Sequence, residues 1–560
     1  MAKTLWLIWD GASHALVVDL LQRGALPHLQ RVVARGRLAA MAPPGPNSET
    51  PPGLMTLFTG CEEADHGIPG FTAPLPSSPQ HSVLASVSGF DIRVLRRPPV
   101  WVEAAAARRT VSLVCTAFAP DPLQRVPYPW PYPTASYCCV IDGYNREMAR
   151  PQLVRLREGT TTLTMAEQTY KVHQEKHGYT VYSPSGAAMP LVPFHQPEDL
   201  LPLWLDRPAG IGAYVAWLRA SGTPESDWLW CSAVHQLASY PHQNWPHDLG
   251  PFLGAGIGWF FSRGFIGKGP RLAVSTLQAL TCSVARFFGE MAVQALARHP
   301  ADLMLFYQPA IDEISHQMLR DALADWPYGT AAQAMLAVHQ EVDHQLGRLL
   351  DGLEDDDTLL ISSDHGHEPI HRAIRPNVLL RRAGLLSIKA DKIDLARTCA
   401  VFHSSGWVLV NTTDRAGGIV SRGDYEATLQ EVAQCLEAAV DPTTGKSLGL
   451  QHSRSLWQGD APPPGDLFIW APPHVELRPY LFGPVCTPPE IGGNHQTSLH
   501  DSPYLQALLA GCGPGLHGTP LPTRNSGVAS LSRRALRLPT TDTLGMLAPS
   551  PAGRGQGQRG

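Results

Sequence analysis

Six Asp and His residues of this sequence are placed so that they could bind metal ions. Each lies close to a short apolar run, and they are Asp10, Asp312, His316, Asp364, His365 and His500. Carboxylate and imidazole ligands together suit zinc, manganese or iron better than calcium. Two sets of three ligands would hold two cations about 4 Å apart, and such a pair stabilises the attacking and leaving oxygens of an in-line displacement at phosphorus.

A seventh candidate, Thr50, stands in the segment NSETPPGLMTLFTG, residues 47–60. Thr is a favoured helix N-cap and Pro is favoured at the first helical position, so Thr50 and Pro51 predict a helix start. A helix N-terminus also attracts anions, and a hydroxyl held there beside a metal is a candidate nucleophile. The local sequence leaves both roles of Thr50 open.

The elements that must position these residues alternate between strand and helix patterns. Apolar runs of strand length lie within residues 4–11, 303–307, 356–364 and 504–514, and amphipathic helical patterns occupy 14–24 and 329–353. Asp312 and His316 are expected on a loop after the second strand. The alternation predicts an α/β fold with a mainly parallel sheet sandwiched by helices. Ligands of such sheets gather at the carboxyl ends of strands, where these acidic and His residues fall.

Two regions depart from this rhythm. Residues 72–285 are rich in Pro, Trp and Tyr and are predicted to form an inserted cap or substrate region. Residues 385–485 are predicted to form a small α+β insertion, with strands at WVLVN and DLFIW and a helix at DYEATLQEVAQCLEAAV. The catalytic core is then expected in three parts, 1–71, 286–384 and 486–535, followed by a disordered tail at 536–560.

Composition excludes several classes of protein. The net charge is −5, and 44% of the residues are hydrophobic, so the chain is globular and lacks the basic surface of a nucleic-acid binder. The apolar run Leu5–Trp9 is too short for a signal peptide, and no stretch is long and apolar enough to span a bilayer. We expect a cytoplasmic protein with no membrane or nucleic-acid partner. The ten scattered Cys residues predict neither a disulfide scaffold nor a zinc finger.

Several stretches resemble, in the same order, motifs of the alkaline phosphatase superfamily, on its type I phosphodiesterase/nucleotide pyrophosphatase side. They lie between residues 4 and 517 and include ETPPGLMTLFTGCEEADHGIPGF, DLMLFYQPAIDEISHQ, LLISSDHGHEPIHRAIRPNVLLRRAGLL and LHDSPYLQALLAGCGPGL. The group of predicted phosphohydrolases or phosphomutases is the most similar part of that superfamily. The resemblance implies an alkaline phosphatase-like fold and metal-dependent hydrolysis of phosphodiester or pyrophosphate bonds in a small, nucleotide-like substrate.

The same resemblance implies a role for each candidate residue. One divalent ion, Zn²⁺ or alternatively Mn²⁺, would be held by Asp10, Thr50, Asp364 and His365, and a second by Asp312, His316 and His500. Thr50 would attack phosphorus and form a covalent phospho- or nucleotidyl-threonine, which a metal-bound water would then hydrolyse. His495 is the alternative to His500, which we prefer because HDSPY resembles the family's H-G-S-P-Y. His66 is expected to be structural.

Departures from the family pattern leave other activities open. The family has an Asn three residues after the nucleophile, where this chain has Gly53, so the donor to the phosphate oxygens is not identified. Backbone N–H groups at the helix start could serve in part.

A sulfatase is disfavoured because TPPGL lacks the required Cys or Ser and the Arg. A phosphomonoesterase, a phosphomutase and a catalytically silent metal-binding relative remain alternatives. Aromatic stretches of the insertion could stack a base and would favour a diester.

Overall fold

The computed structural model describes residues 2–120, 136–142, 147–149, 152–156, 159–165, 168–175, 178–192, 201–205, 213–220, 228–231, 234–240 and 274–538. Two aromatic stretches of the predicted cap, PYPWPYP (127–133) and HQNWPHD (242–248), lie outside these residues, as does the tail from residue 539 onward. Within the described ranges, no helix combines the length and the apolar character needed to cross a lipid bilayer.

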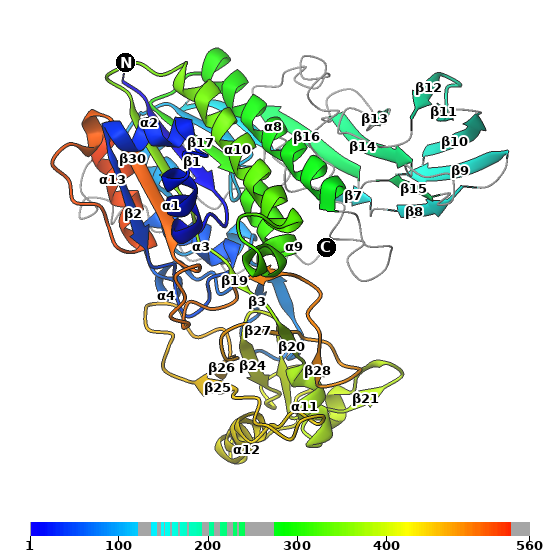
Figure 1. Ribbon diagram of the computed structural model, residues 1–560. Coiled ribbons are helices and arrows are strands. Elements are labelled where there is room, and N and C mark those ends of the chain that lie inside the picture. Colours follow the sequence, from blue (N-terminus) through cyan, green and yellow to red (C-terminus); the bar gives the residue numbers. More distant parts are fainter. Residues whose placement is uncertain are drawn as a thin grey trace, which may run out of the picture.

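A large sheet forms the centre of the molecule (Figure 1). Its central strands run parallel in the order β18 (Thr358–Ser362), β1 (Thr4–Trp9), β17 (Leu303–Gln308), β5 (Val111–Val114) and β6 (Tyr137–Asp142). Beyond β18, β30 (Ala507–Cys512) and β2 (Arg37–Met41) extend the sheet in antiparallel orientation. Every residue of β1, β17 and β18 is buried, as expected for strands covered on both faces. The predicted α/β fold with a mainly parallel central sheet is confirmed.

Helices flank this sheet in two groups. The first group is α2 (Pro27–Arg35), α8 (Val274–Arg298), α9 (Ala310–Ala324) and α10 (Thr330–Leu350), which pack along one another. The second group is α3 (Thr50–Thr59), α5 (Val100–Ala106) and α13 (Val528–Ala535). α1 (His14–Gln22) packs beside β30. Side chains of both groups and of the strands share one hydrophobic core, which fixes the helices relative to the strand ends.

The register of the parallel strands brings their carboxyl ends together. Trp9 of β1 pairs with Gln308 of β17, and Ile8 pairs with Ser362 of β18. The Asp10 N–H then donates to the Gln308 carbonyl at 3.0 Å. The segments that follow these three strands therefore leave the sheet side by side, at the edge where α/β proteins bind ligands.

The segment after β17 is a helix, whereas a loop was expected. α9 starts directly after Pro309 and buries Ile311, Ile314 and Met318 at helical spacing. Two acidic residues stand in its first turn, where they interact favourably with the helix dipole. The prediction of a loop was wrong because the apolar helical repeat begins inside the run DLMLFYQPAIDEISH. As a result, Asp312 and His316 lie one turn apart on the same helix face.

The region predicted as an inserted cap, 72–285, contributes strands to the central sheet. Its strands β5 and β6 belong to the parallel part, and further strands continue the sheet in antiparallel pairings beyond β6. These are β16 (Val234–Tyr240), β14 (Ala213–Ala220), β15 (Trp228–Cys231), β8 (Gln152–Arg155), β13 (Leu201–Leu205) and β7 (Glu147–Ala149). A separate antiparallel sheet holds β9 (Thr160–Met165), β10 (Gln168–Glu175), β11 (Gly178–Tyr182) and β12 (Ala188–Leu191).

A second hydrophobic core lies around an antiparallel sheet within residues 374–485 (Figure 1). Its strands are β23 (Ala400–Phe402), β24 (Trp407–Val410), β26 (Leu467–Trp470) and β25 (Gln451–Ser453), covered by α11 (Pro376–Arg382) and α12 (Tyr425–Glu437). The strands predicted at WVLVN and DLFIW and the helix predicted between them correspond to β24, β26 and α12. Short elements link this unit to the first core: α4 (Glu63–His66), β19 (Glu368–Pro369), β20 (Arg372–Ile374), β27 (Val475–Leu477), β28 (Cys486–Thr487) and β29 (Gly493–Asn494).

Candidate active site

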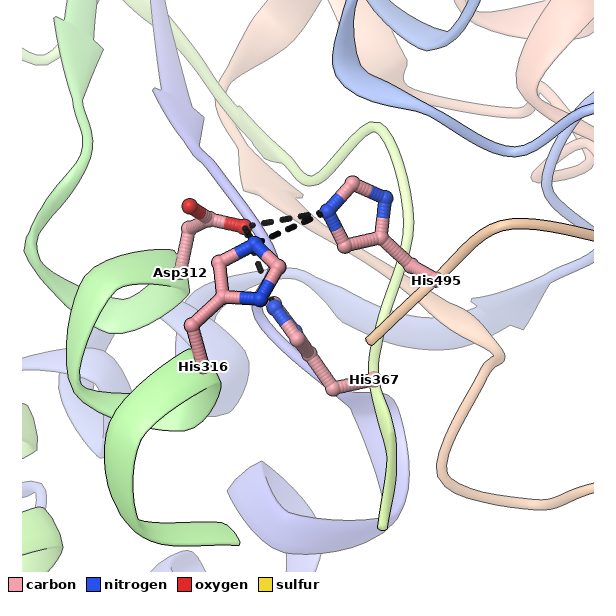
Figure 2. A group of neighbouring side chains, drawn as sticks. All are labelled: Asp312, His316, His367 and His495. Carbon is pink, nitrogen blue, oxygen red and sulfur yellow. Dashed lines mark hydrogen bonds and ion pairs between the residues drawn. The ribbon is translucent and has the colours of Figure 1, made fainter. Parts of the chain in front are cut away.

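Two clusters of Asp and His side chains lie at the carboxyl ends of β1, β17 and β18. The first cluster is Asp10, Asp364 and His365, and the second cluster is Asp312, His316, His367 and His495. All seven residues are buried, and within each cluster the potential ligand atoms lie within 4.8 Å of one another. The side chains of the second cluster point toward a common centre (Figure 2).

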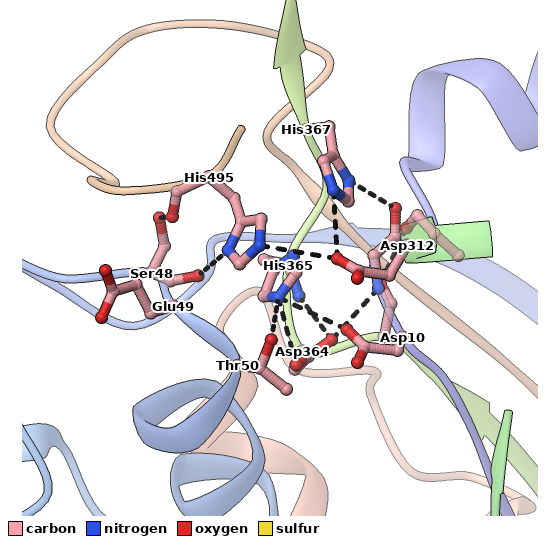
Figure 3. Close-up of polar contacts among 12 residues, drawn as sticks. Asp10, Ser48, Glu49, Thr50, Asp312, Asp364, His365, His367 and His495 are labelled. Carbon is pink, nitrogen blue, oxygen red and sulfur yellow. Dashed lines mark hydrogen bonds and ion pairs between the residues drawn. The ribbon is translucent and has the colours of Figure 1, made fainter. Parts of the chain in front are cut away.

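The first cluster surrounds the His365 imidazole. His365 Nε2 lies 3.4 Å from Asp10 Oδ1 and 3.3 Å from Asp364 Oδ2. The Thr50 hydroxyl lies 3.3 Å from the same nitrogen, so the predicted nucleophile is at this cluster (Figure 3). The Tyr307 hydroxyl donates to Asp10 Oδ2, and the Gly11 N–H donates to Asp364 Oδ1 at 3.3 Å.

Thr50 is the first residue of α3, and Glu49 occupies the N-cap position. The predicted start is therefore correct to within one residue, but Thr50 does not cap the helix. The buried Glu49 carboxylate accepts hydrogen bonds from the Phe71 N–H at 2.7 Å and from Ser405 Oγ at 2.5 Å. Ser405 belongs to the unit around the second core, so that unit helps to fix the position of the Thr50 hydroxyl.

The second cluster is arranged around Asp312 Oδ1. This oxygen lies 3.4 Å from His316 Nε2 and 3.5 Å from His495 Nε2. The two imidazole nitrogens are 3.2 Å from each other. The clusters are also in direct contact, because the rings of His365 and His495 stack with centroids 3.5 Å apart and planes inclined by 10°.

Backbone carbonyls fix which nitrogen of each imidazole faces the clusters. His316 Nδ1 lies 2.8 Å from the Gly493 carbonyl, His365 Nδ1 lies 3.1 Å from the Gly366 carbonyl, and His495 Nδ1 lies 3.0 Å from the Ser48 carbonyl. A carbonyl only accepts hydrogen bonds, so Nδ1 carries the proton in each neutral ring and Nε2 presents its lone pair. Imidazole ligands of metals are commonly oriented by such a contact.

Electrostatics and hydrogen bonding both fit cations at the clusters. Burial, reinforced by the charges of Asp364 and Asp312, raises the pKa of Asp10 well above its ordinary value. Burial also raises the pKa of Asp364 to about 7 and lowers that of His365 to about 3. Asp10 Oδ1, Asp312 Oδ1 and Asp364 Oδ2 are buried and form no hydrogen bond among the described residues. Buried carboxylate oxygens that accept no hydrogen bond are costly, and a bound cation would remove that cost.

His500 does not join either cluster, contrary to the expectation from HDSPY. Its Nδ1 lies 2.7 Å from Glu368 Oε2, and its Nε2 lies 2.7 Å from the Ala471 carbonyl, so both nitrogens are engaged. Burial opposes its protonation, but the contact with Glu368 raises the pKa of His500 overall. His495 occupies the position that we expected for His500. Sequence reasoning also missed His367, whose available signal was a second imidazole two residues after His365.

The first turn of α3 offers few backbone donors to an anion. Pro51 and Pro52 have no N–H, and the Gly53 N–H donates to the Glu49 carbonyl at 3.0 Å. The expected contribution of backbone N–H groups is thus limited, within this turn, to that of Thr50. His66 lies in α4 with its Nε2 3.0 Å from Thr56 Oγ1, which fits the structural role expected for it.

Several solved structures are similar to this chain. They include human ectonucleotide pyrophosphatase/phosphodiesterase 5, at 12% identity and a TM-score of 0.49, covering 98% of this chain and 100% of that one. An inactive, singly substituted form of the murine protein in complex with AMP has 13% identity and a TM-score of 0.48, covering 96% of each chain. Phosphonoacetate hydrolase from Sinorhizobium meliloti, in complex with phosphonoformate, has 14% identity and a TM-score of 0.43, covering 95% of this chain and 96% of that one.

No curated protein matches the chain. The family model for type I phosphodiesterase/nucleotide pyrophosphatase, in contrast, matches residues 4–455. This span includes Thr50, the whole first cluster, and Asp312, His316 and His367 of the second cluster. The chain therefore belongs to the type I phosphodiesterase/nucleotide pyrophosphatase family.

Proposed function

We propose that this protein is a two-metal phosphohydrolase that cleaves phosphodiester or pyrophosphate bonds in nucleotide-like substrates, with Thr50 as the nucleophile. The family supports phosphoester hydrolysis as the reaction class. The observation that carries the role of Thr50 is its hydroxyl, which is buried and 3.3 Å from His365 Nε2 at the first cluster. The same α3 N-terminus faces a set of carboxylates, an arrangement that a purely capping residue does not require.

The chain's own donors divide into two sets. Asp10, Asp364 and His365, with the Thr50 hydroxyl, would hold one divalent cation, and Asp312, His316 and His495 would hold the other. Mixed carboxylate and imidazole donors favour Zn²⁺, with Mn²⁺ as the alternative. When bound, such cations neutralise the phosphate oxygens and favour deprotonation of the hydroxyl.

Hydrolysis then proceeds in two displacements. Thr50 Oγ1 loses its proton and forms a bond to phosphorus while the bond to the leaving oxygen breaks, and that oxygen departs with the electron pair and takes up a proton. A water molecule next bonds to phosphorus, the bond to Thr50 Oγ1 breaks, and a proton returns to the hydroxyl. Tyr307 and the Gly11 N–H hold the two carboxylates of the first cluster in place during both steps.

Replacement of Thr50 tests this proposal. Thr50→Ala should lower turnover of bis-p-nitrophenyl phosphate by at least about a thousandfold, because nothing replaces the lost nucleophile. Metal analysis should still find two ions per chain. Thr50→Ser keeps a hydroxyl and should retain part of the activity. Unchanged hydrolysis by the Ala variant contradicts the assignment of the nucleophile.

A metal-binding relative without catalysis is the alternative reading, and the scarcity of N–H donors in the first turn of α3 favours it. Bound metal with no turnover of mono- and diesters, dinucleoside polyphosphates or sugar phosphates would support it.

A reaction in ¹⁸O-labelled water distinguishes a phosphotransferase from a hydrolase. Hydrolysis places solvent oxygen in the phosphate product, and transfer to a second substrate does not.

A further inference from the structure

His367 lies inside the second cluster although neither the family resemblance nor the pattern of residues at strand ends identified it as a ligand. Its Nε2 is 3.1 Å from Asp312 Oδ1, the closest of the three imidazole nitrogens to that oxygen. Its ring centroid lies 4.7 Å from that of His316 and 4.9 Å from that of His495. The three rings thus surround one carboxylate oxygen (Figure 2).

The orientation of His367 follows the same rule as the other histidines of the site. Its Nδ1 lies 3.3 Å from the Gly11 carbonyl, which can only accept a hydrogen bond. Nδ1 therefore carries the proton, and the lone pair of Nε2 faces Asp312. This nitrogen is buried and forms no hydrogen bond among the described residues. Such a nitrogen is a ready donor to a cation.

The fold makes room for this ring at Gly11. That residue has a φ of +67°, and a Cβ there would lie 2.5 Å from His367 Cε1 and 2.8 Å from Asp312 Cα. Any larger residue would push the imidazole away from the cluster. Gly11 therefore supports both clusters. Its N–H donates a hydrogen bond to Asp364 of the first cluster, and the absence of a Cβ leaves space for the His367 ring in the second cluster.

The lone pairs of the cluster also oppose one another unless something lies between them. His316 Nε2 and His495 Nε2 are 3.2 Å apart, and the carbonyl contacts leave neither nitrogen with a proton to share in the neutral form. His367 adds a third lone pair beside the Asp312 carboxylate. Three nitrogens and one oxygen directed at one centre match the donor number of a tetrahedral zinc site.

We infer that His367 is a fourth protein ligand of the second cation, which gives the second cluster four protein donors. This inference rests on the proposed two-metal function. The first cluster supplies three protein donors and the Thr50 hydroxyl, so it keeps a position for a reacting group. The second cluster would hold its cation with four protein donors, and a phosphate oxygen would bind that cation as a fifth ligand during the reaction. It should therefore prefer cations with tetrahedral geometry and release them more slowly than the first cluster does.

Cobalt-substituted protein tests the coordination directly. In Asp10→Asn the first cluster is weakened, so one equivalent of Co²⁺ should occupy the second cluster. We expect the intense visible absorption of tetrahedral Co²⁺ and three imidazole ligands by X-ray absorption spectroscopy. Two imidazoles with a weak, five- or six-coordinate spectrum would overturn the inference. This measurement does not require a His367 variant to fold.

Substitution provides the second test. On the Asp10→Asn background, His367→Met should weaken Co²⁺ binding at the second cluster by at least about 100-fold, since loss of an outer-shell partner alone costs about 10- to 100-fold. His500→Met is the matched control, and it should leave affinity and spectrum unchanged. Equal affinity and an equal spectrum in His367→Met overturn the inference.

The proposed hydrolysis can fail independently of this inference. If Thr50→Ala is as active as the unmodified protein while the cobalt results hold, the nucleophile is wrong and the coordination of His367 stands. If hydrolysis depends on Thr50 but His367→Met keeps its metal, only the fourth ligand is wrong.

Discussion

Gly53 lies one turn into α3 and packs against Asp364 of the first cluster. A Cβ at this position would lie 2.9 Å from Asp364 Cβ and 3.4 Å from Asp364 Oδ2. Gly53→Ala should therefore displace the carboxylate and weaken cation binding at the first cluster by roughly tenfold. This loss should occur although Ala normally stabilises a helix interior by about 1 kcal/mol relative to Gly. Calorimetric titration with Mn²⁺ measures it.

The control for this prediction is a glycine with space around it. At Gly423 a Cβ would meet, among the described residues, only Ser421 Oγ, at 3.7 Å, so Gly423→Ala should leave both metal affinities unchanged. Equal affinities in Gly53→Ala and Gly423→Ala would show that Asp364 tolerates the added methyl group. The contact also explains the departure from the family pattern, because an Asn at position 53 begins with the same Cβ.

At the scale of single residues, site residues that come directly after a strand could be predicted from the sequence, whereas those in long connections were predicted less well. Asp10 and Asp364 could be placed because each ends a strand pattern. His495 and His500 could not be separated, since HDSPY does not reveal that His500 contacts Glu368, more than a hundred residues earlier. His367 could be recognised as part of the second cluster only from its contacts with the Gly11 carbonyl and Asp312 in the folded chain.

At the scale of elements, the apolar runs predicted β1, β17 and β18 within one or two residues, because buried parallel strands are continuous apolar runs. The membership of β5 and β6 in the same sheet was not predicted. Both lie in a region whose Pro and aromatic content suggested an insertion, and strand order depends on contacts between distant residues. The start of α9 was missed for a local reason, namely that its first turn carries the acidic residues expected of a loop.

His66 connects α4 to α3, and its burial predicts a dependence of stability on pH. The Ile68 N–H donates to His66 Nδ1 at 3.2 Å, and burial lowers the pKa of His66 from 6.5 to about 3. Between these values the unfolded chain binds a proton that the folded chain does not bind. The free energy of unfolding should therefore fall as the pH falls, by about 1.4 kcal/mol per pH unit from this residue.

Replacement of His66 isolates that contribution. His66→Asn keeps an acceptor near the Ile68 N–H but cannot titrate, so its stability should depend less steeply on pH, by about the same 1.4 kcal/mol per unit. Denaturant unfolding from about pH 6 to about pH 4 measures both slopes. His517→Asn is the control, because His517 is exposed and meets water before and after unfolding. Parallel curves for the unmodified protein and His66→Asn would contradict the prediction.

At the scale of the whole molecule, the two clusters join parts of the chain that are far apart in sequence. Their residues come from the end of β1, the first turns of α9, the segment after β18 and the segment after β29, between Asp10 and His495. The unit around the second core contributes a contact near the site, because Ser405 Oγ of that unit donates a hydrogen bond to Glu49, the residue before Thr50. Because the two clusters share a ring stack between His365 and His495, loss of one cation should disturb the other.

Removal of metal should therefore lower the stability of the entire fold. A cation that binds only the folded state stabilises it by about 4 kcal/mol when its free concentration is a thousand times the dissociation constant. Without cations, Asp10, Asp312 and Asp364 each keep one buried carboxylate oxygen that forms no hydrogen bond with the part of the chain that the structure describes. A chelator should lower the midpoint of thermal unfolding by several degrees, measured by calorimetry, and added Zn²⁺ should restore it. In Asp312→Asn/His495→Gln the shift should be smaller, because the second cluster can no longer bind tightly. An unfolding midpoint that is the same with and without chelator, in a protein shown to lose its metal, would mean that the clusters contribute no stability through cations.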